Sequence, residues 1–237
     1  MAAGTILGRA VVVKAQRVLN DLNAGNWPLD EVVDWLNEGQ RRITLLRPDA
    51  SSELKEMDLV AGTLQSVPAG TVRILDVTRN VGGRAITYIK RADLDAFDAG
   101  WHTGAANVIV KHWASDERLP ERFWCYPPQP ASPGQIEILR SVLPANVTLD
   151  GVNGESVDSV IGISDIYEGP LIDFTVYRSF TKDATYTVRG GKADMAWNHF
   201  LQSLGIQLTT DRRWSSEVNT PPHQTAQQRL NTGAFQP

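Results

Sequence analysis

Near the N-terminus, apolar residues recur at intervals of about three, four and seven, the period of a helix with one buried face. We expect helices over residues 5–22 and 28–46. Thr5 is placed to cap the first helix, and Gly25 suits a left-handed conformation after it. A short polar turn between the two helices predicts an antiparallel hairpin.

From about residue 53 the pattern changes to short runs rich in β-branched and aromatic residues, separated by turn signals. Gly82-Gly83 suits a tight hairpin, and Pro127-Pro128-Gln129-Pro130 is typical of a turn. We interpret this stretch as an inserted antiparallel β module. Its expected strands are 55–60, 63–67, 72–80, 84–90, 108–113, 123–126 and 135–142.

The helical period returns after a polar connector at residues 143–163. Ser164-Asp165 is a candidate cap for a third helix that carries an apolar stripe to Phe180. A fourth helix is expected over residues 192–204, with Gly205 as its C-terminal stop. Beyond it, large apolar side chains are too sparse to offset the entropy lost when a segment orders on its own surface.

These elements predict an α+β fold. We expect an antiparallel helical bundle of two N-terminal and two C-terminal helices, with an inserted antiparallel β module and an extended C-terminal arm. The predicted division is residues 1–50 for the helical hairpin, 51–150 for the β module, 151–205 for the helices completing the bundle, and 206–237 for the arm.

Composition narrows the functional classes. The 237 residues carry 23 basic and 27 acidic side chains, a net charge of −4, which excludes a strongly basic nucleic-acid binder but not a surface past which DNA slides. One cysteine, Cys125, excludes an intrachain disulfide and a multi-cysteine metal site. Its apolar neighbours predict a buried, inert thiol. We expect no signal peptide, because the N-terminus has no long apolar core followed by a small-residue cleavage site. We expect no membrane contact, because no stretch approaches the roughly 18 apolar residues of a span.

No arrangement of residues indicates catalysis, so we expect neither enzyme activity nor a cofactor or metal. Gly190-Gly191-Lys192 lacks the spacing of a phosphate loop. The four histidines form no helical pair, although His102 and His112 could face each other across strands. Trp101, Trp113 and Trp124 in the β module could stack on sugars or bases, but core packing or a subunit interface explains them better.

Several short segments, in a fixed order, carry a resemblance to a known family. They are residues 35–40 (WLNEGQ), 46–50 (LRPDA), 62–68, 75–80, 94–95, 101–102, Pro120 with Phe123, 126–128, 177–183 and 200–205. Together, across about residues 5–205, they resemble the adaptor, or head-to-tail connector, proteins of short-tailed bacteriophages.

The resemblance implies a structural protein of the virion, at the head–tail junction and made in the host cytoplasm. It implies a homo-oligomeric ring, commonly of twelve copies, between the portal protein and the tail nozzle protein, through which double-stranded DNA passes. It implies no active site or cofactor. It gives Gly62 and Pro68 a role in shaping a strand and Asn80 a role in a turn.

The resemblance also implies that C-terminal segments grip the portal. The arm offers few groups for such contacts, and Trp214 is the best anchor because an otherwise polar segment has little else to bury. The candidate partner-binding residues are Leu208, Arg212, Arg213, Trp214, Val218, Leu230 and Phe235. The alternative is a tail-associated β binding module that contacts a glycan or another tail protein.

Overall fold

The computed structural model describes residues 4–116, 118–149, 157, 159–182 and 187–214, with the backbone alone at 187–190 and 206–214. Its α-helices are α1 (Gly8–Leu19), α2 (Leu29–Leu46), α3 (Arg91–Phe97), α4 (Glu168–Lys182) and α5 (Thr187–Trp214). Its strands are β1 (Ser52–Asp58), β2 (Gly62–Ser66), β3 (Thr71–Asn80), β4 (Thr87–Tyr88), β5 (His112–Ser115), β6 (Arg122–Gln129) and β7 (Gln135–Val142). Short 3₁₀ turns occur at Pro48–Ser51, Trp101–Thr103 and Asp165–Tyr167.

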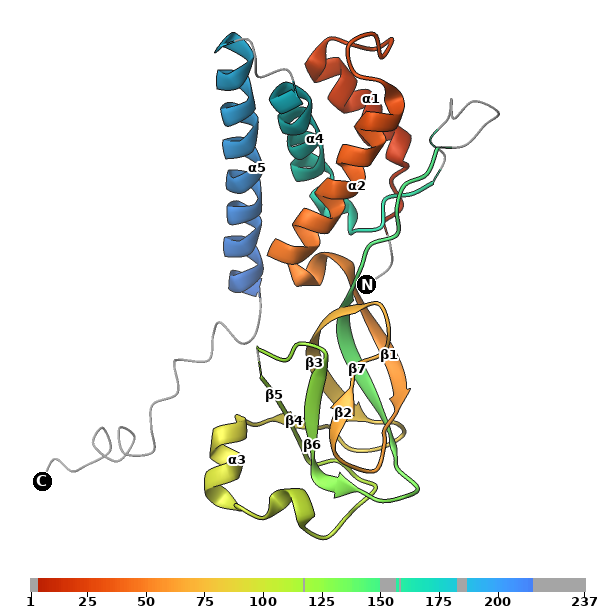
Figure 1. The fold of residues 1–237 in the computed structure, drawn as a ribbon, viewed down its shortest axis with the longest axis vertical. Coiled ribbons are helices and arrows are strands. Elements are labelled where there is room, and N and C mark those ends of the chain that lie inside the picture. The colour runs from red at the N-terminus through yellow and green to blue at the C-terminus, as the bar shows by residue number, and fades with distance from the viewer. Residues whose placement is uncertain (1–3, 117, 150–156, 158, 183–186, 215–237) are drawn as a thin grey trace, which may run out of the picture.

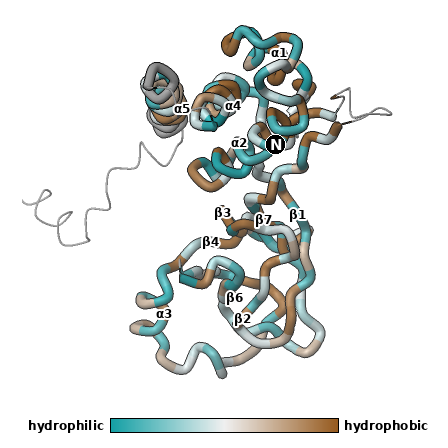
Figure 2. The backbone as a smooth tube through the Cα atoms, turned by 45° about the horizontal axis from the view of Figure 1, so that its top comes forward, coloured by the Kyte–Doolittle hydropathy of each residue, from teal (hydrophilic) through white to brown (hydrophobic). Residues whose placement is uncertain are grey.

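The molecule consists of two parts, one helical and one rich in strands (Figures 1 and 2). The helical part holds α1, α2, α4 and α5, and the β module holds the strands with α3. The chain crosses between them twice, from α2 into β1 and from β7 back toward the helices (Figure 1). Each part has its own buried apolar cluster, so the two are packed largely independently. Within the described residues, no helix is both long enough and apolar enough to cross a bilayer.

The α+β class predicted from the sequence holds, but the antiparallel helical bundle is wrong. Helix α4 is the centre of the helical part, and α1, α2 and α5 each pack mainly on it. The first two helices, expected to form a hairpin packed along its length, contact each other at only a few positions.

The segment read as a polar connector explains this difference. Val147, Val157, Ile161 and Ile163 are all buried and belong to the core of the helical part. Extended chain therefore occupies space that helix–helix contact would fill in a bundle. Its backbone is hydrogen-bonded to the start of α1, where the Gly8 N–H donates to the Ser159 carbonyl over 2.8 Å.

The β module contains a three-stranded sheet of order β1-β7-β3 and a four-stranded sheet of order β2-β6-β5-β4. All pairs are antiparallel except β4 with β5, which is parallel, so the expectation of a wholly antiparallel module is wrong at that edge. Helix α3 was also not predicted. It covers the end of the module through Leu94, which is buried with Trp101 and Trp124.

Individual strands agree with the sequence to different degrees. The β7 bounds match the expected 135–142, whereas only two residues of the expected 84–90 form β4. The predicted turn after β3 is present, because the Asn80 side-chain amide donates to the Arg84 carbonyl over 3.1 Å. The turn predicted at residues 127–130 starts too early, because β6 continues through Gln129 and the chain leaves the strand only at Pro130.

Three predicted helix ends are also corrected. Gly205 does not stop the last helix, because α5 runs on to Trp214 and the expected arm from residue 206 begins as helix. Thr5 does not cap α1; its hydroxyl instead donates to the Asp165 carboxylate over 2.6 Å. The left-handed residue that ends α1 is Asn20, with φ of 56°, rather than Gly25.

Candidate functional site: a groove between α2, α4 and α5

The residues predicted to bind a partner lie at the C-terminal end of the chain. Four of them fall on the last turns of α5, where the structure describes the backbone alone: Leu208, Arg212, Arg213 and Trp214. Val218, Leu230 and Phe235 lie outside the described residues. Their role as a contact surface therefore stays a prediction.

The candidate chemical groups of the β module are engaged in its own structure. His102 shares a hydrogen bond of 2.8 Å with Thr63, and His112 shares one of 2.6 Å with Thr87, so each histidine pairs with a threonine rather than with the other histidine. Cys125 is buried as predicted, and burial raises the pKa of its thiol to about 12. In the described part of the chain, no three potential metal-ligating side chains gather into a site.

The tryptophans of the β module are core residues. Trp101, Trp113 and Trp124 are at most 8% exposed, which leaves no open aromatic face for a sugar or a base. This confirms the core interpretation. Trp197 of α5 is different, because it is only partly buried and faces a hollow between three helices.

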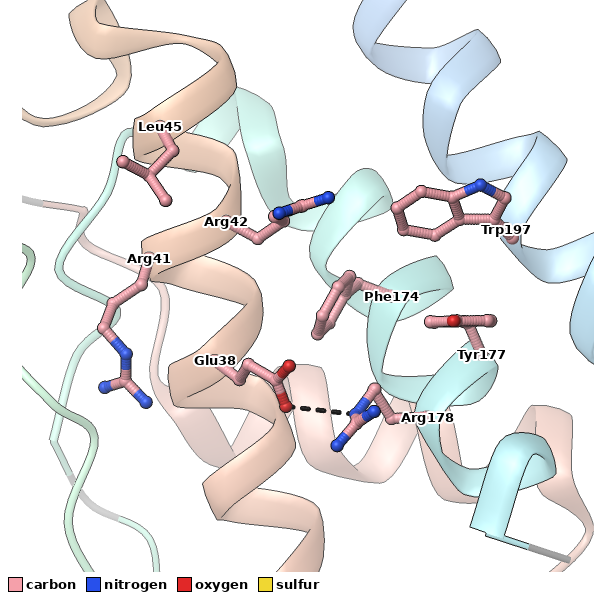
Figure 3. A pocket seen from close by; sticks show the side chains of 8 residues that line it. All are labelled: Glu38, Arg41, Arg42, Leu45, Phe174, Tyr177, Arg178 and Trp197. Carbon is pink, nitrogen blue, oxygen red and sulfur yellow. Dashed lines mark ion pairs between the residues drawn. The ribbon is translucent and has the colours of Figure 1, made fainter.

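That hollow, called the groove from here on, brings charged and aromatic side chains of the helical part together. It has a volume of about 340 Å³ and opens between α2, α4 and α5 (Figure 3). Its lining residues are Glu38, Arg41, Arg42, Leu45, Phe174, Tyr177, Arg178 and Trp197. Those from α2 recur at three- and four-residue steps, which brings them to one side of the helix.

Aromatic rings form the floor of the groove. The ring centroids of Tyr177 and Trp197 are 4.9 Å apart, and those of Phe174 and Tyr177 are 5.9 Å apart. Phe200 of α5 is fully buried and contacts rings of both α4 and α5. Its ring centroid is 5.4 Å from that of Phe174 and 5.2 Å from that of Trp197. Because the rings contact one another across α4 and α5, the floor is fixed by the core.

The close approach of α2 to α4 forms the wall opposite α5. It depends on Gly39, since a Cβ atom there would lie 2.8 Å from Leu171 and 2.9 Å from Phe174. The residue before Gly39, Glu38, forms an ion pair with Arg178, with 3.0 Å between the carboxylate oxygen and the guanidinium nitrogen (Figure 3). This pair joins the two helices across the groove.

Two arginines stand on the rim. The guanidinium carbon of Arg42 lies 6.0 Å from the centroid of the Trp197 ring, in the range of a cation–π contact, and Figure 3 shows it extended toward that ring. Arg41 extends away from the aromatic rings and donates to the side-chain oxygen of Asn146 over 3.0 Å (Figure 3). Within the described residues, neither arginine forms an ion pair with a carboxylate.

A second hollow of about 360 Å³ adjoins the groove and shares Arg178 with it. Its lining includes Glu31, Asp34 and Lys182, and the Lys182 ammonium pairs with the Glu31 carboxylate. The charge along the α2–α4 line therefore changes from basic beside Arg42 to mixed beside Asp34.

The sequence did not predict this groove. Arg41 and Arg42 lie within the helix expected over residues 28–46, but nothing in their spacing indicates a partner for them. The sequence did indicate the segment 35–40, which the structure explains: Asn37 and Gln40 hydrogen-bond the connector, and Gly39 admits α4. The groove itself needs Trp197, which is far away in the sequence and is brought close only by the packing of α5 on α4.

Comparison with known proteins identifies a family. A family model described as SU10 adaptor protein matches residues 10–221, which is most of the chain. No curated protein matches the sequence.

Proposed function

This chain belongs to the SU10 adaptor protein family, and on that premise we propose that it is a non-enzymatic ring subunit connecting the capsid portal to the tail of a phage. The family supports the coarser part of this statement directly: the chain is a structural adaptor protein of a bacteriophage and a component of the virion. The ring, its twelve copies, the portal and nozzle partners and the passage of DNA are the proposed part.

The architecture supports a ring in two ways. A ring is closed by heterologous interfaces, in which two different surfaces of each subunit meet. An extended subunit with two separately packed parts offers such surfaces without needing one large core. The net charge of −4 suits a channel that lets DNA pass without holding it.

We propose that the end of α5 and the residues after it contact the portal. At 1.5 Å per residue, the 28 residues of α5 span about 42 Å, whereas the 15 residues of α4 span about 22 Å. Figure 1 shows α5 running on past the end of α4. The last turns of α5 carry Leu208, Arg212, Arg213 and Trp214, four of the seven candidate contact residues.

The test is capture of the purified full chain on rings of the portal protein from the same phage. We expect the chain to be retained and to form a complex whose mass, measured by native mass spectrometry, corresponds to a whole number of copies per portal ring. Trypsin is expected to cut the free chain first after Arg212, Arg213 or Arg229, with protection at these sites once the portal is bound. Absence of capture from freshly assembled portal rings would refute the proposal.

A further inference from the structure

We propose that the groove between α2, α4 and α5 binds a short acidic segment of another protein chain, anchored by one large apolar side chain. The groove is formed by one chain alone, so this inference does not rest on the proposed function.

The lining of the groove is more basic than the rest of the molecule. Three arginines and one glutamate line the groove, which gives it a net charge of +2 in a molecule whose total is −4. Arg178 is neutralised by Glu38 and Arg41 extends away from the aromatic rings, so the charge that faces the floor of the groove is that of Arg42. A guanidinium without a carboxylate partner can donate two parallel hydrogen bonds to an incoming Asp or Glu.

Arg42 is positioned by a contact within the protein before any partner binds. Its contact with the Trp197 ring holds the guanidinium at the rim, where it still has donors to offer. A side chain already ordered in this way loses less conformational freedom when it binds an anion. Trp197 is itself fixed by the rings of Tyr177 and Phe200.

The apolar part of the occupant follows from the floor and the lip of the groove. Leu45 stands at the edge with 65% of its surface exposed, beside the aromatic floor. A cavity of about 340 Å³ is large enough for one Leu, Phe or Trp side chain with neighbouring backbone. Burying such a side chain contributes the apolar contact that a charged rim alone does not provide.

A nucleic-acid backbone fits this surface less well, although it is also acidic. Glu31 and Asp34 lie in the adjoining hollow, and Glu38 lies in the groove itself. A continuous polyanion laid along α2 would pass these carboxylates, whereas a short acidic segment meets only the basic end. The same change of charge gives the segment a direction.

The test measures binding of a short fluorescein-labelled peptide, rich in Glu with Leu and Phe spaced for one helical face, to the full chain. Fluorescence anisotropy is expected to show binding that weakens as salt is raised. A peptide with Lys in place of Glu, and one with Ala in place of Leu and Phe, are each expected to bind about tenfold more weakly or worse.

Matched variants assign the binding to the groove. The double substitution Arg41→Glu with Arg42→Glu is expected to reduce affinity at least about tenfold. The control, Arg9→Glu with Arg17→Glu, makes the same charge change at exposed positions of α1 and should leave affinity unchanged. Unaltered circular dichroism and thermal midpoints establish that both variants fold.

Three results would overturn the inference. The first is equal binding of the acidic peptide by the groove variant and the control variant. The second is binding of a duplex DNA oligonucleotide, but not the peptide, that depends on Arg41 and Arg42. The third is a change in self-association on sedimentation with no effect on the peptide, which would make a second copy of the chain the occupant. None of these results would bear on capture by the portal.

Discussion

Asp21 organises the loop between α1 and α2 with one carboxylate. The side chain is 7% exposed and accepts three backbone hydrogen bonds of 2.9–3.0 Å, from Gly25, Asn26 and Trp27. Burial alone would raise its pKa, but the three N–H donors hold the pKa of Asp21 below its ordinary value of 3.8. The ionised form is therefore the one that stabilises the loop.

Replacing Asp21 with Asn should destabilise the fold by about 2 kcal/mol at neutral pH, because hydrogen bonds to a charged acceptor are stronger than those to an amide. A carboxyl group with a lowered folded-state pKa contributes stability above its unfolded pKa and loses it as pH falls through the folded-state value. The gap between wild type and variant should therefore close in acid.

Urea denaturation at a series of pH values between about 7 and about 3 measures this gap. Asp34→Asn, at an exposed position of α2, is the control and should change little. A difference for Asp21→Asn that stays constant across the series would show that the charge is not responsible.

At the scale of elements, α2 determines how the helical part is assembled. On one side, the Asn37 amide exchanges hydrogen bonds of 2.9 and 2.8 Å with the backbone of Val147, and Gln40 accepts from the Gly162 N–H over 2.5 Å. On another side, Gly39 brings α2 close to α4. One short segment thus fixes both the connector and the groove wall.

Gly39→Ala tests this close packing. The added methyl group would lie under 3 Å from Leu171 and Phe174, so α2 and α4 must move apart. We expect a loss of about 1–3 kcal/mol in the free energy of unfolding, even though alanine favours a helix. Thermal and urea unfolding measure it, and an unchanged or more stable variant would show that the helices separate at no cost.

Gly205→Ala tests the opposite situation within α5. A Cβ atom at Gly205 meets no described atom within 4 Å, and the helix continues past this position. Alanine should therefore stabilise the protein by up to about 1 kcal/mol and raise the helical signal in circular dichroism. Had Gly205 been a left-handed stop, as its sequence context predicted, the same substitution would destabilise the chain.

The helices of the helical part differ in how well the sequence predicted their bounds and packing. The bounds of α2 were predicted within one residue, because its apolar period is strong and Arg47-Pro48 follows it. The end of α5 was wrong because a glycine is only one possible stop signal, and helix continued through it. The bundle was wrong because Val147, Val157, Ile161 and Ile163 are scattered through a polar segment, where no period marks them as core.

The candidate site was harder to predict for a related reason. The Arg42–Trp197 contact joins residues more than a hundred positions apart, and neither has a distinctive neighbour pattern. Spacing along the chain gives the face of α2 but not its partner. Only the packing of α5 on α4 brings the tryptophan to the arginine.

At the scale of the whole molecule, the two crossings between the helical part and the β module are tied together. The Ser51 hydroxyl donates to the Val142 carbonyl over 2.6 Å, which joins the outgoing strand to the returning one. Beside them, the largely buried Arg140 guanidinium pairs with Glu53 over 2.6 Å. The β module is thereby held at a defined entry point, on the side of the helical part toward which α5 runs (Figure 1).

The core of the helical part ends before the candidate portal contacts begin. The last buried residues described on α5 are Phe200 and Leu204. A chain ending at Gly205 keeps both, and a chain ending at Trp214 also keeps the rest of α5. Both truncated chains are therefore expected to fold, with thermal midpoints within a few degrees of the full chain.

Their capture by portal rings should differ. The chain ending at Gly205 lacks all seven candidate contact residues and should not be retained, whereas the chain ending at Trp214 keeps four and should bind more weakly than the full chain. Binding of the acidic peptide in the groove should be the same in both, because every residue lining the groove precedes residue 205. If the shorter chain is captured as well as the full one, the portal contact lies on the body of the protein, and the groove becomes the first surface to mutate.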